Sequence, residues 1–175
     1  MSSITIISAT NRDDSNSEKI ATFYLSILKK KGLDASLLSL KDLPESFLSS
    51  DLYGKRSDKF QEIINTYIEH QTKFVFVSPE YNGSFAGVLK VFLDAINPKI
   101  WTDNKACLVG VSSGRAGNLR GLEHLTNILN YLKLNVYHNK LPISVVNQLL
   151  DSEGNLSDLE TKKVIELQLE GFLNF

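Results

Sequence analysis

Residues 73–96, KFVFVSPEYNGSFAGVLKVFLDAI, join a nearly continuous apolar run to a helical pattern through the six-residue turn PEYNGS. An apolar run of this length, followed at once by apolar residues at helical spacing, is typical of a strand buried on both faces and its crossover helix. We predict the strand at 73–78 and the helix at 85–96, with Pro79 ending the strand and Ser84 capping the helix. The stretch therefore predicts one strand–helix unit of a parallel sheet.

The remaining sequence repeats this alternation. Further strands are predicted at 3–8, 35–40, 105–112 and 135–137, the last of which 143–146 could extend, and further helices at 17–31, 60–70, 119–132 and from about 157. Alternating strands and helices imply right-handed crossovers and a parallel sheet covered on both faces. We therefore expect an α/β fold with one domain, 1–175. It is a flavodoxin-like three-layer sandwich whose five-stranded parallel sheet has the order 2-1-3-4-5 and binds ligands at the carboxyl ends of its strands.

Composition narrows the classes of function. The net charge of −1 gives no electrostatic reason to expect a nucleic acid or a membrane surface as partner. The start of the chain, MSSITIISATNRDD, has no basic leader, and no apolar stretch approaches the roughly 20 residues of a membrane span. Cys107 is the single cysteine and the three histidines are scattered, so neither a disulfide nor a metal site is expected. We expect a metal-free cytoplasmic protein in which Cys107 is a buried, inert thiol.

The loop after the first strand, SATNRDDSNS at 8–17, contains no glycine, which excludes a Walker A loop and a Gly-x-Gly-x-x-Gly turn. Hydroxyls, a guanidinium and the free N–H groups of a helix start could together hold a phosphate. The alternative is purely structural, with Ser15 and Glu18 forming a capping box whose carboxylate would repel a phosphate. Asp13 and Asp14 lower the local positive charge, so Arg12 has to supply it.

The other two loops could face a planar ligand. PEYNGS is either a plain connection with a surface aromatic or a row of backbone donors and acceptors beside the ring of Tyr81. SSGRAGN, at 112–118, has glycines that permit close backbone approach, and Arg115 supplies a cation or a stacking plane. Parallel strands bring all three loops to one edge of the sheet.

Together the three loops resemble the NADPH-dependent FMN reductase family, flavodoxin-like enzymes that include azo-dye, quinone and chromate reductases. PEYNGS followed by GVLKVFLD is close to the family's P-E-Y-N-G-S element and G-x-L-K-N-x-[IL]-D helix, and the resemblance covers most of the chain. The chain departs from the family pattern at Ala9-Thr10, where Gly-Ser is common. It also departs at Ala86, Val91 and Asn118, where proline, asparagine and glycine are frequent.

The resemblance implies FMN as cofactor and NADPH or NADH as co-substrate, in a homodimer or homotetramer. By this likeness the phosphate is held by Thr10, Arg12, Ser15, Asn16 and Ser17. The isoalloxazine ring lies along Pro79, Glu80, Tyr81, Asn82 and Gly83, and its other side is closed by Ser112, Ser113, Gly114 and Arg115. The electron acceptor is then a quinone, an azo compound, free flavin or a metal oxyanion.

Because the flavin carries the chemistry, no catalytic acid, base or nucleophile is expected. Glu80 is expected to orient its loop, and the apolar residues within the long polar connection 41–58 are expected to pack, including onto a partner subunit. The main alternative is a flavodoxin-like FMN electron carrier without nicotinamide activity. A further alternative is a relative that has lost its flavin and serves in interactions.

Overall fold

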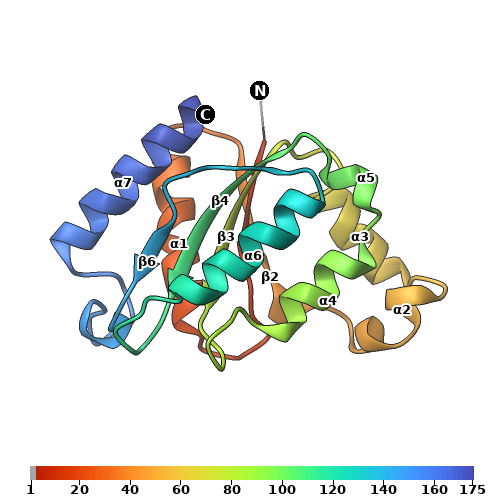
Figure 1. Cartoon of the computed structure of the whole chain (residues 1–175), viewed down its shortest axis with the longest axis horizontal. Helices are drawn as coiled ribbons and strands as arrows, with labels where there is room; N and C mark the ends of the chain where they lie inside the picture. Colours follow the sequence, from red (N-terminus) through yellow and green to blue (C-terminus); the bar gives the residue numbers. More distant parts are fainter. Residues whose placement is uncertain (1–2) are drawn as a thin grey trace.

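The computed structural model describes residues 3–175, which form one parallel sheet with helices on both faces (Figure 1). The strand order is β2-β1-β3-β4-β5, and β6 also pairs with β4. The strands are β1 (Ile4–Ser8), β2 (Ala35–Ser39), β3 (Lys73–Pro79), β4 (Lys105–Val111), β5 (Asn135–Val136) and β6 (Leu141–Ile143). The predicted fold class and strand order are confirmed.

The last position of the sheet is divided between two short strands. β5 pairs with the start of β4 and β6 with its end, so the segment predicted to extend the strand at 143–146 begins and ends earlier, at Leu141–Ile143. At the break, the buried amide of Gln168 donates to the carbonyls of Leu108 (3.1 Å) and Asn139 (2.8 Å). A side chain thus supplies hydrogen bonds where the strand is interrupted.

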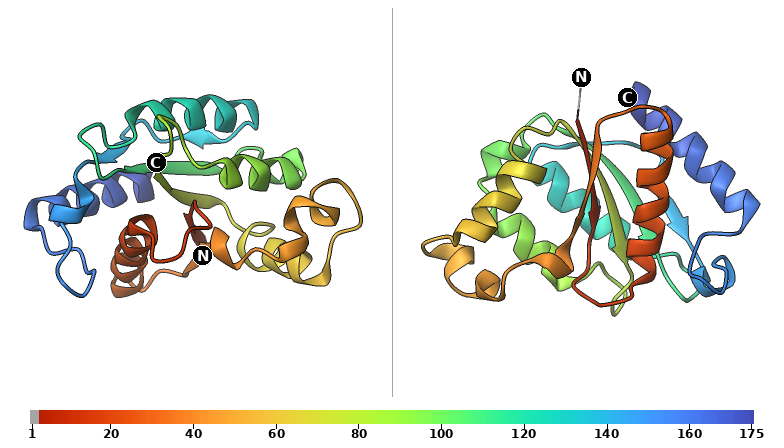
Figure 2. Two further views of the ribbon diagram at one scale, coloured as in Figure 1. Left: turned by 90° about the horizontal axis from the view of Figure 1, so that it is seen from below. Right: turned by 180° about the vertical axis from the view of Figure 1, so that it is seen from behind.

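Two helical layers enclose the sheet. The helices α1 (Asn16–Lys30) and α7 (Leu159–Asn174) cover one face, seen from behind in Figure 2. The helices α3 (Asp58–Tyr67), α4 (Gly87–Ala95) and α6 (Leu119–Tyr131) cover the other. Successive residues of β1 face opposite helical layers. Ile6 packs with the layer of α1 and α7, and Ile7 packs with the layer of α3, α4 and α6.

The connection 41–58 is ordered through short helical turns, and Phe47 is buried in the core. Leu48 and Tyr53 are 72% and 83% exposed, so part of its apolar surface faces outward. The short elements of the chain are η1 (Leu40–Asp42), η2 (Glu45–Leu48), α2 (Ser50–Tyr53), α5 (Pro98–Trp101) and η3 (Val146–Gln148).

Two helices begin two residues later than predicted, and Ser84 is not the predicted helix cap. The helix after β3 begins at Gly87, because the N–H and the carbonyl of Ser84 both bond to Tyr81 in a closed turn. The last helix begins at Leu159, where the carboxylate of Asp158 accepts the N–H of Thr161 (2.7 Å). The hydroxyl of Ser157 instead donates to a carbonyl of the preceding turn.

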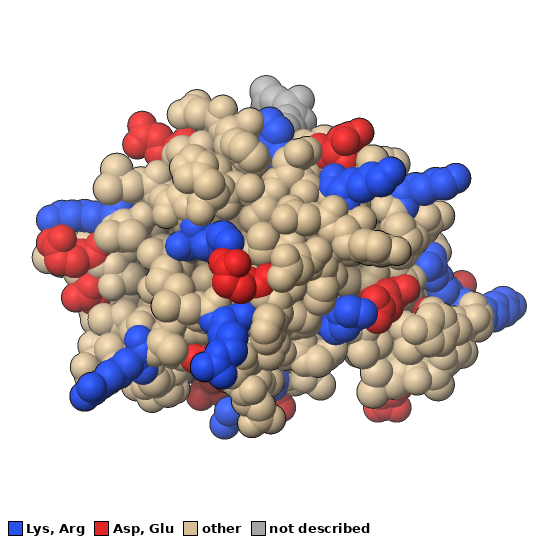
Figure 3. Space-filling model, in the orientation of Figure 1, with Lys and Arg blue, Asp and Glu red and all other residues tan. Residues whose placement is uncertain are grey.

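Acidic and basic side chains are interspersed over the face shown in Figure 3. Within residues 3–175, the helices are too short or too polar to cross a bilayer.

Candidate functional site

The loops that follow β1, β3 and β4 meet at one edge of the sheet, at the bottom of Figure 1 and facing the viewer in the left panel of Figure 2. A cavity of about 420 Å³ opens between the first and second loops. A second cavity of about 430 Å³ lies between the second and third loops, and Glu80, Ser112 and Ser113 border both. These volumes lie in the range of small-molecule sites, about 300–1,000 Å³.

The structure brings nearly all of the predicted site residues to these two cavities. The first is lined by Arg12, Ser15, Asn16, Ser17, Pro79, Glu80, Tyr81, Ser112 and Ser113, and the second adds Asn82, Gly83, Gly114 and Arg115. Thr10 lines neither cavity. It is buried, and its hydroxyl lies 2.8 Å from the hydroxyl of Tyr81.

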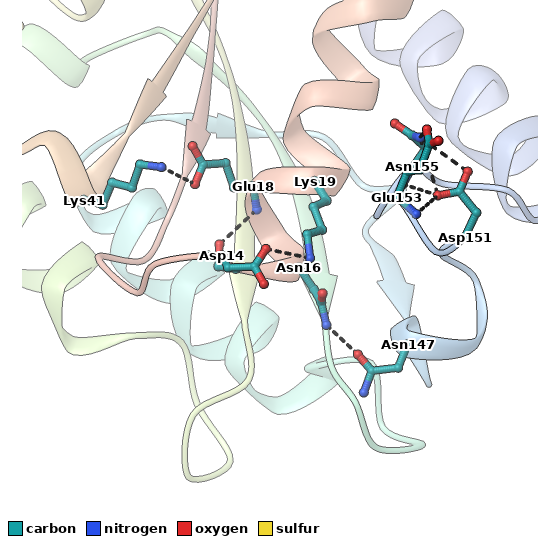
Figure 4. A network of polar contacts seen from close by, with 10 residues as sticks. Asp14, Asn16, Glu18, Lys19, Lys41, Asn147, Asp151, Glu153 and Asn155 are labelled. Atoms are coloured by element: carbon teal, nitrogen blue, oxygen red, sulfur yellow. Dashed lines mark hydrogen bonds and ion pairs between the residues drawn. The ribbon is translucent and has the colours of Figure 1, made fainter.

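Two acidic residues at the start of α1, Asp14 and Glu18, pair with lysines (Figure 4). Ser15 caps α1 by accepting the N–H of Glu18 (3.1 Å), but the Glu18 carboxylate does not fold back as a capping box requires. It pairs instead with Lys41 at 3.1 Å, and this hydrogen bond and charge raise the pKa of Lys41. Asp14 pairs with Lys19 at 2.8 Å, which lowers the pKa of Asp14. The predicted repulsion of an anion by Glu18 is thereby removed.

The first cavity offers donors that fit a phosphate. The hydroxyl of Ser17 is buried and, within the described part of the chain, has no hydrogen-bond partner. The N–H groups of Asn16 and Ser17 belong to the first turn of α1, where a helix has no acceptor of its own. Arg12 is exposed at the rim. This set of donors at a positive helix end is suited to an anion with several oxygens.

The second loop presents free backbone donors at its tip. Tyr81 and Ser84 exchange two hydrogen bonds of 2.8 and 3.0 Å around Asn82 and Gly83, whose φ angles are +52° and +76°. Positive φ at both central residues is the geometry that an Asn-Gly pair favours. Among the hydrogen bonds of residues 3–175, none uses the N–H of Asn82 or Gly83. Both groups remain available to a ligand in the second cavity.

Glu80 holds the second and third loops together. Its N–H donates to the carbonyl of Val111 (2.9 Å), and its carboxylate accepts the N–H of Asn118 (3.2 Å). The side chain therefore orients the loop, as predicted, while it also borders both cavities.

Asn118 is a positioning residue that the sequence did not reveal. It is fully buried with φ +63°, and its amide donates to the carbonyls of Ser78 (3.1 Å) and Pro79 (2.9 Å). Asparagine tolerates this left-handed conformation better than most residues. The frequent glycine at this position in the family was the available signal, because glycine also accepts positive φ.

Val146 and Asn147 form a further wall of the first cavity that was not predicted. The amide of Asn16 donates to the side-chain oxygen of Asn147 (2.7 Å), so the start of α1 is tied to the segment after β6 (Figure 4). A last strand assigned to 141–143 would have placed this segment at the same edge of the sheet.

Cys107 and Trp101 lie away from this edge. Cys107 is completely buried in β4, and burial raises the pKa of its thiol. Trp101 is also completely buried and packs edge-on against Phe74. Across residues 3–175, histidine, cysteine and carboxylate side chains form no group of three or more that could hold a metal ion.

Comparisons with known proteins show the family of the chain. Residues 2–148 match the family described as NADPH-dependent FMN reductase. An NAD(P)H-dependent FMN reductase of Pseudomonas aeruginosa is 29% identical over 143 residues, which cover 79% of this chain and 76% of that protein. An NAD(P)H:quinone oxidoreductase of Solanum tuberosum is 32% identical over 142 residues, covering 75% of this chain and 70% of that protein.

The fold is shared with solved structures. FerB, a flavoenzyme NAD(P)H:(acceptor) oxidoreductase from Paracoccus denitrificans, superimposes with a TM-score of 0.81, covering 99% of this chain and 96% of its own. The two sequences are 22% identical, so this likeness concerns the fold. The family match over residues 2–148 shows that the chain belongs to the NADPH-dependent FMN reductase family, oxidoreductases that use FMN and a nicotinamide.

Proposed function

We propose that the protein transfers hydride from NADPH or NADH to bound FMN and passes the electrons to a small-molecule acceptor. The observation that carries this proposal is the convergence of three loops around cavities that offer unpaired phosphate donors at one end and unpaired backbone N–H groups at the other. A flavin mononucleotide combines an anionic phosphate with a planar ring that has acceptors along one edge. The residues present therefore fit this cofactor.

In this assignment the first loop holds the phosphate and the other two hold the ring. Arg12, Asn16 and Ser17 supply charge and N–H or O–H donors for the phosphate. Ser15 adds a hydroxyl, and Thr10 fixes the loop through Tyr81. The N–H groups of Asn82 and Gly83 stabilise the negative charge that develops on the ring. When bound, FMN supplies the hydride and electron transfer itself.

A quinone is the acceptor that we propose first. Relatives from Solanum tuberosum and Arabidopsis thaliana carry the name quinone oxidoreductase, at 32% and 30% identity. Azo compounds, free flavin and metal oxyanions are the other candidates. We further propose that the protein acts in the cytoplasm. We also propose a homodimer or homotetramer, because exposed apolar residues such as Leu48 and Tyr53 suit a subunit contact.

The test is a flavin titration followed by turnover assays. Purified protein should bind FMN, shown by quenching of flavin fluorescence, and should then oxidise NADPH or NADH with benzoquinone as acceptor. Binding without nicotinamide oxidation would identify the alternative, an FMN electron carrier. Failure to bind FMN would contradict both, and parallel assays with an azo dye, free FMN and chromate would rank the acceptors.

A further inference from the structure

Three of the four arginines in the chain gather at the site, and the fourth lies elsewhere. Arg12 lines the first cavity and Arg115 the second, while Arg120 lies beside the second loop. Within residues 3–175, the side chains of these three arginines make no hydrogen bond and no ion pair. Arg56, by contrast, donates to the carbonyl of Ala95 and lies over the ring of Phe60. Unpaired guanidinium groups around a cavity indicate an anionic ligand.

Arg120 lies against the turn at the tip of the second loop. A Cβ atom added to Gly83 would stand 3.2 Å from the Nη1 atom of Arg120. One turn further along α6, Nδ1 of His124 lies 2.9 Å from the hydroxyl of Ser84. Residues four apart share one face of a helix, so this face of α6 borders the turn that presents free N–H groups.

The contact between α6 and the second loop is fixed by close packing. A Cβ atom on Gly121 would stand 2.8 Å from the backbone nitrogen of Phe85 and 2.0 Å from the amide oxygen of Asn118. The helix therefore approaches the loop where no larger side chain fits. Arg120, next to this glycine, lies against the turn of the second loop because the backbone of α6 approaches that loop, and within residues 3–175 no carboxylate pairs with it.

The nearby carboxylates are already engaged. Glu123, on the same helix, pairs with Lys140 at 2.7 Å, and Glu80 accepts the N–H of Asn118. All five ion pairs within residues 3–175 use lysine, so the arginines of the site remain open to an external anion.

We infer that Arg120, together with Arg115, binds the pyrophosphate of the nicotinamide dinucleotide. This inference rests on the proposed function, in which the nicotinamide must reach the flavin held by the second and third loops. The pyrophosphate lies nearer to the nicotinamide than the adenosine 2′-phosphate does, and the guanidinium fork matches phosphate oxygens. NADH and NADPH share this group. Each arginine should therefore contribute as much to the affinity for NADH as to the affinity for NADPH. Replacement of Arg120 should leave FMN binding unchanged.

The test measures binding of NAD⁺ and NADP⁺ to the FMN-loaded protein by isothermal titration calorimetry, with no turnover. Arg120→Gln should weaken both nucleotides by about tenfold, the size expected for loss of a charge-assisted phosphate contact. Arg120→Lys should restore part of the affinity, because the charge returns without the fork. Lys59→Gln is the matched control, since it removes an exposed charge from α3, which packs against β2, and should change neither affinity.

Each other result overturns the assignment. Equal nucleotide binding by wild type and Arg120→Gln would exclude the contact, and a loss confined to NADP⁺ would place the 2′-phosphate there instead. Weaker FMN binding by Arg120→Gln would assign the arginine to the cofactor. Wild-type protein that binds FMN but neither nucleotide would contradict the proposed function itself. An effect of Arg120→Gln that persists undiminished at high salt would also count against a charge contact.

Discussion

The hydroxyl of Thr10 lies 2.8 Å from the hydroxyl of Tyr81, and this contact joins the first loop of the site to the second. The oxygen of Thr10 also accepts the N–H of Arg12 (3.2 Å). One buried hydroxyl therefore sets the position of the loop proposed to hold the phosphate relative to the loop proposed to hold the ring. The family resemblance implies a phosphate contact for Thr10, and from this hydrogen bond we propose a positioning role for it.

Removing the phenol hydroxyl should loosen this connection. Tyr81→Phe is expected to lower the free energy of unfolding by about 1 kcal/mol, because the buried hydroxyl of Thr10 loses one of its two hydrogen-bond partners. FMN affinity should also fall, since the two loops are no longer held together. Urea unfolding and flavin titration measure the two effects. Tyr53→Phe, at an 83% exposed position, is the control and should change neither quantity. Wild-type behaviour of Tyr81→Phe would show that packing alone positions the loops.

The assignment of Arg12 to a phosphate predicts discrimination between two flavins. Arg12→Ala should weaken FMN by about tenfold, the scale of a charge-assisted hydrogen bond, and leave riboflavin nearly unchanged because riboflavin has no phosphate. Arg115→Ala is the comparison, since a residue beside the ring should weaken both flavins alike. Fluorescence titrations with the two flavins provide the measurement. Equal losses of both flavins in Arg12→Ala would place Arg12 away from the phosphate.

The buried Asn118 predicts an unusual order of stability among its variants. Both Asn118→Ala and Asn118→Gly lose the bonds to the carbonyls of Ser78 and Pro79, at a cost of about 1–3 kcal/mol. Alanine adds strain of about 1 kcal/mol at φ +63°, whereas glycine adds none of this steric strain. Asn118→Gly should therefore be the more stable variant in chemical denaturation. The reverse order would mean that the left-handed conformation is not kept.

Asp51 predicts a dependence of stability on pH. Burial acts to raise its pKa, but the hydrogen bonds from Ser46 and Ser57 and the charge of Arg56 outweigh burial and lower the pKa. The unfolded chain therefore takes up the proton first as the pH falls. The stabilisation is fully present above the unfolded pKa of about 3.9 and is lost as the pH falls through the folded pKa.

Asp51→Asn tests this account. The amide places a donor against the groups that donate to the carboxylate, so we expect a loss of about 2 kcal/mol at pH 7. The difference from wild type should shrink below about pH 4, where the carboxylate becomes protonated. Urea unfolding across this pH range measures it, with the exposed Asp34→Asn as control. A difference that stays constant with pH would exclude the carboxylate as its source.

Local patterns predicted the elements and their order well. The apolar runs of β1, β3 and β4 and the helical spacing of α1 and α6 are strong because each segment is buried against a neighbour over its whole length. The errors fall where long-range contacts compete with local signals. Ser84 has the side chain of a helix cap, but its backbone closes a turn with Tyr81 and its hydroxyl meets His124.

The sequence by itself determined the parallel α/β fold, the three loops at one edge and the family of the chain, because periodicity and the PEYNGS signature are local properties. Only the tertiary structure decided how the loops are held. Thr10 meets Tyr81, Asn118 meets the end of β3, and Asn16 meets Asn147, which is 131 residues away in the chain. Such contacts depend on the crossovers and on the close approach of α6 to the second loop. The spacing of residues within one segment of the sequence therefore cannot predict these contacts.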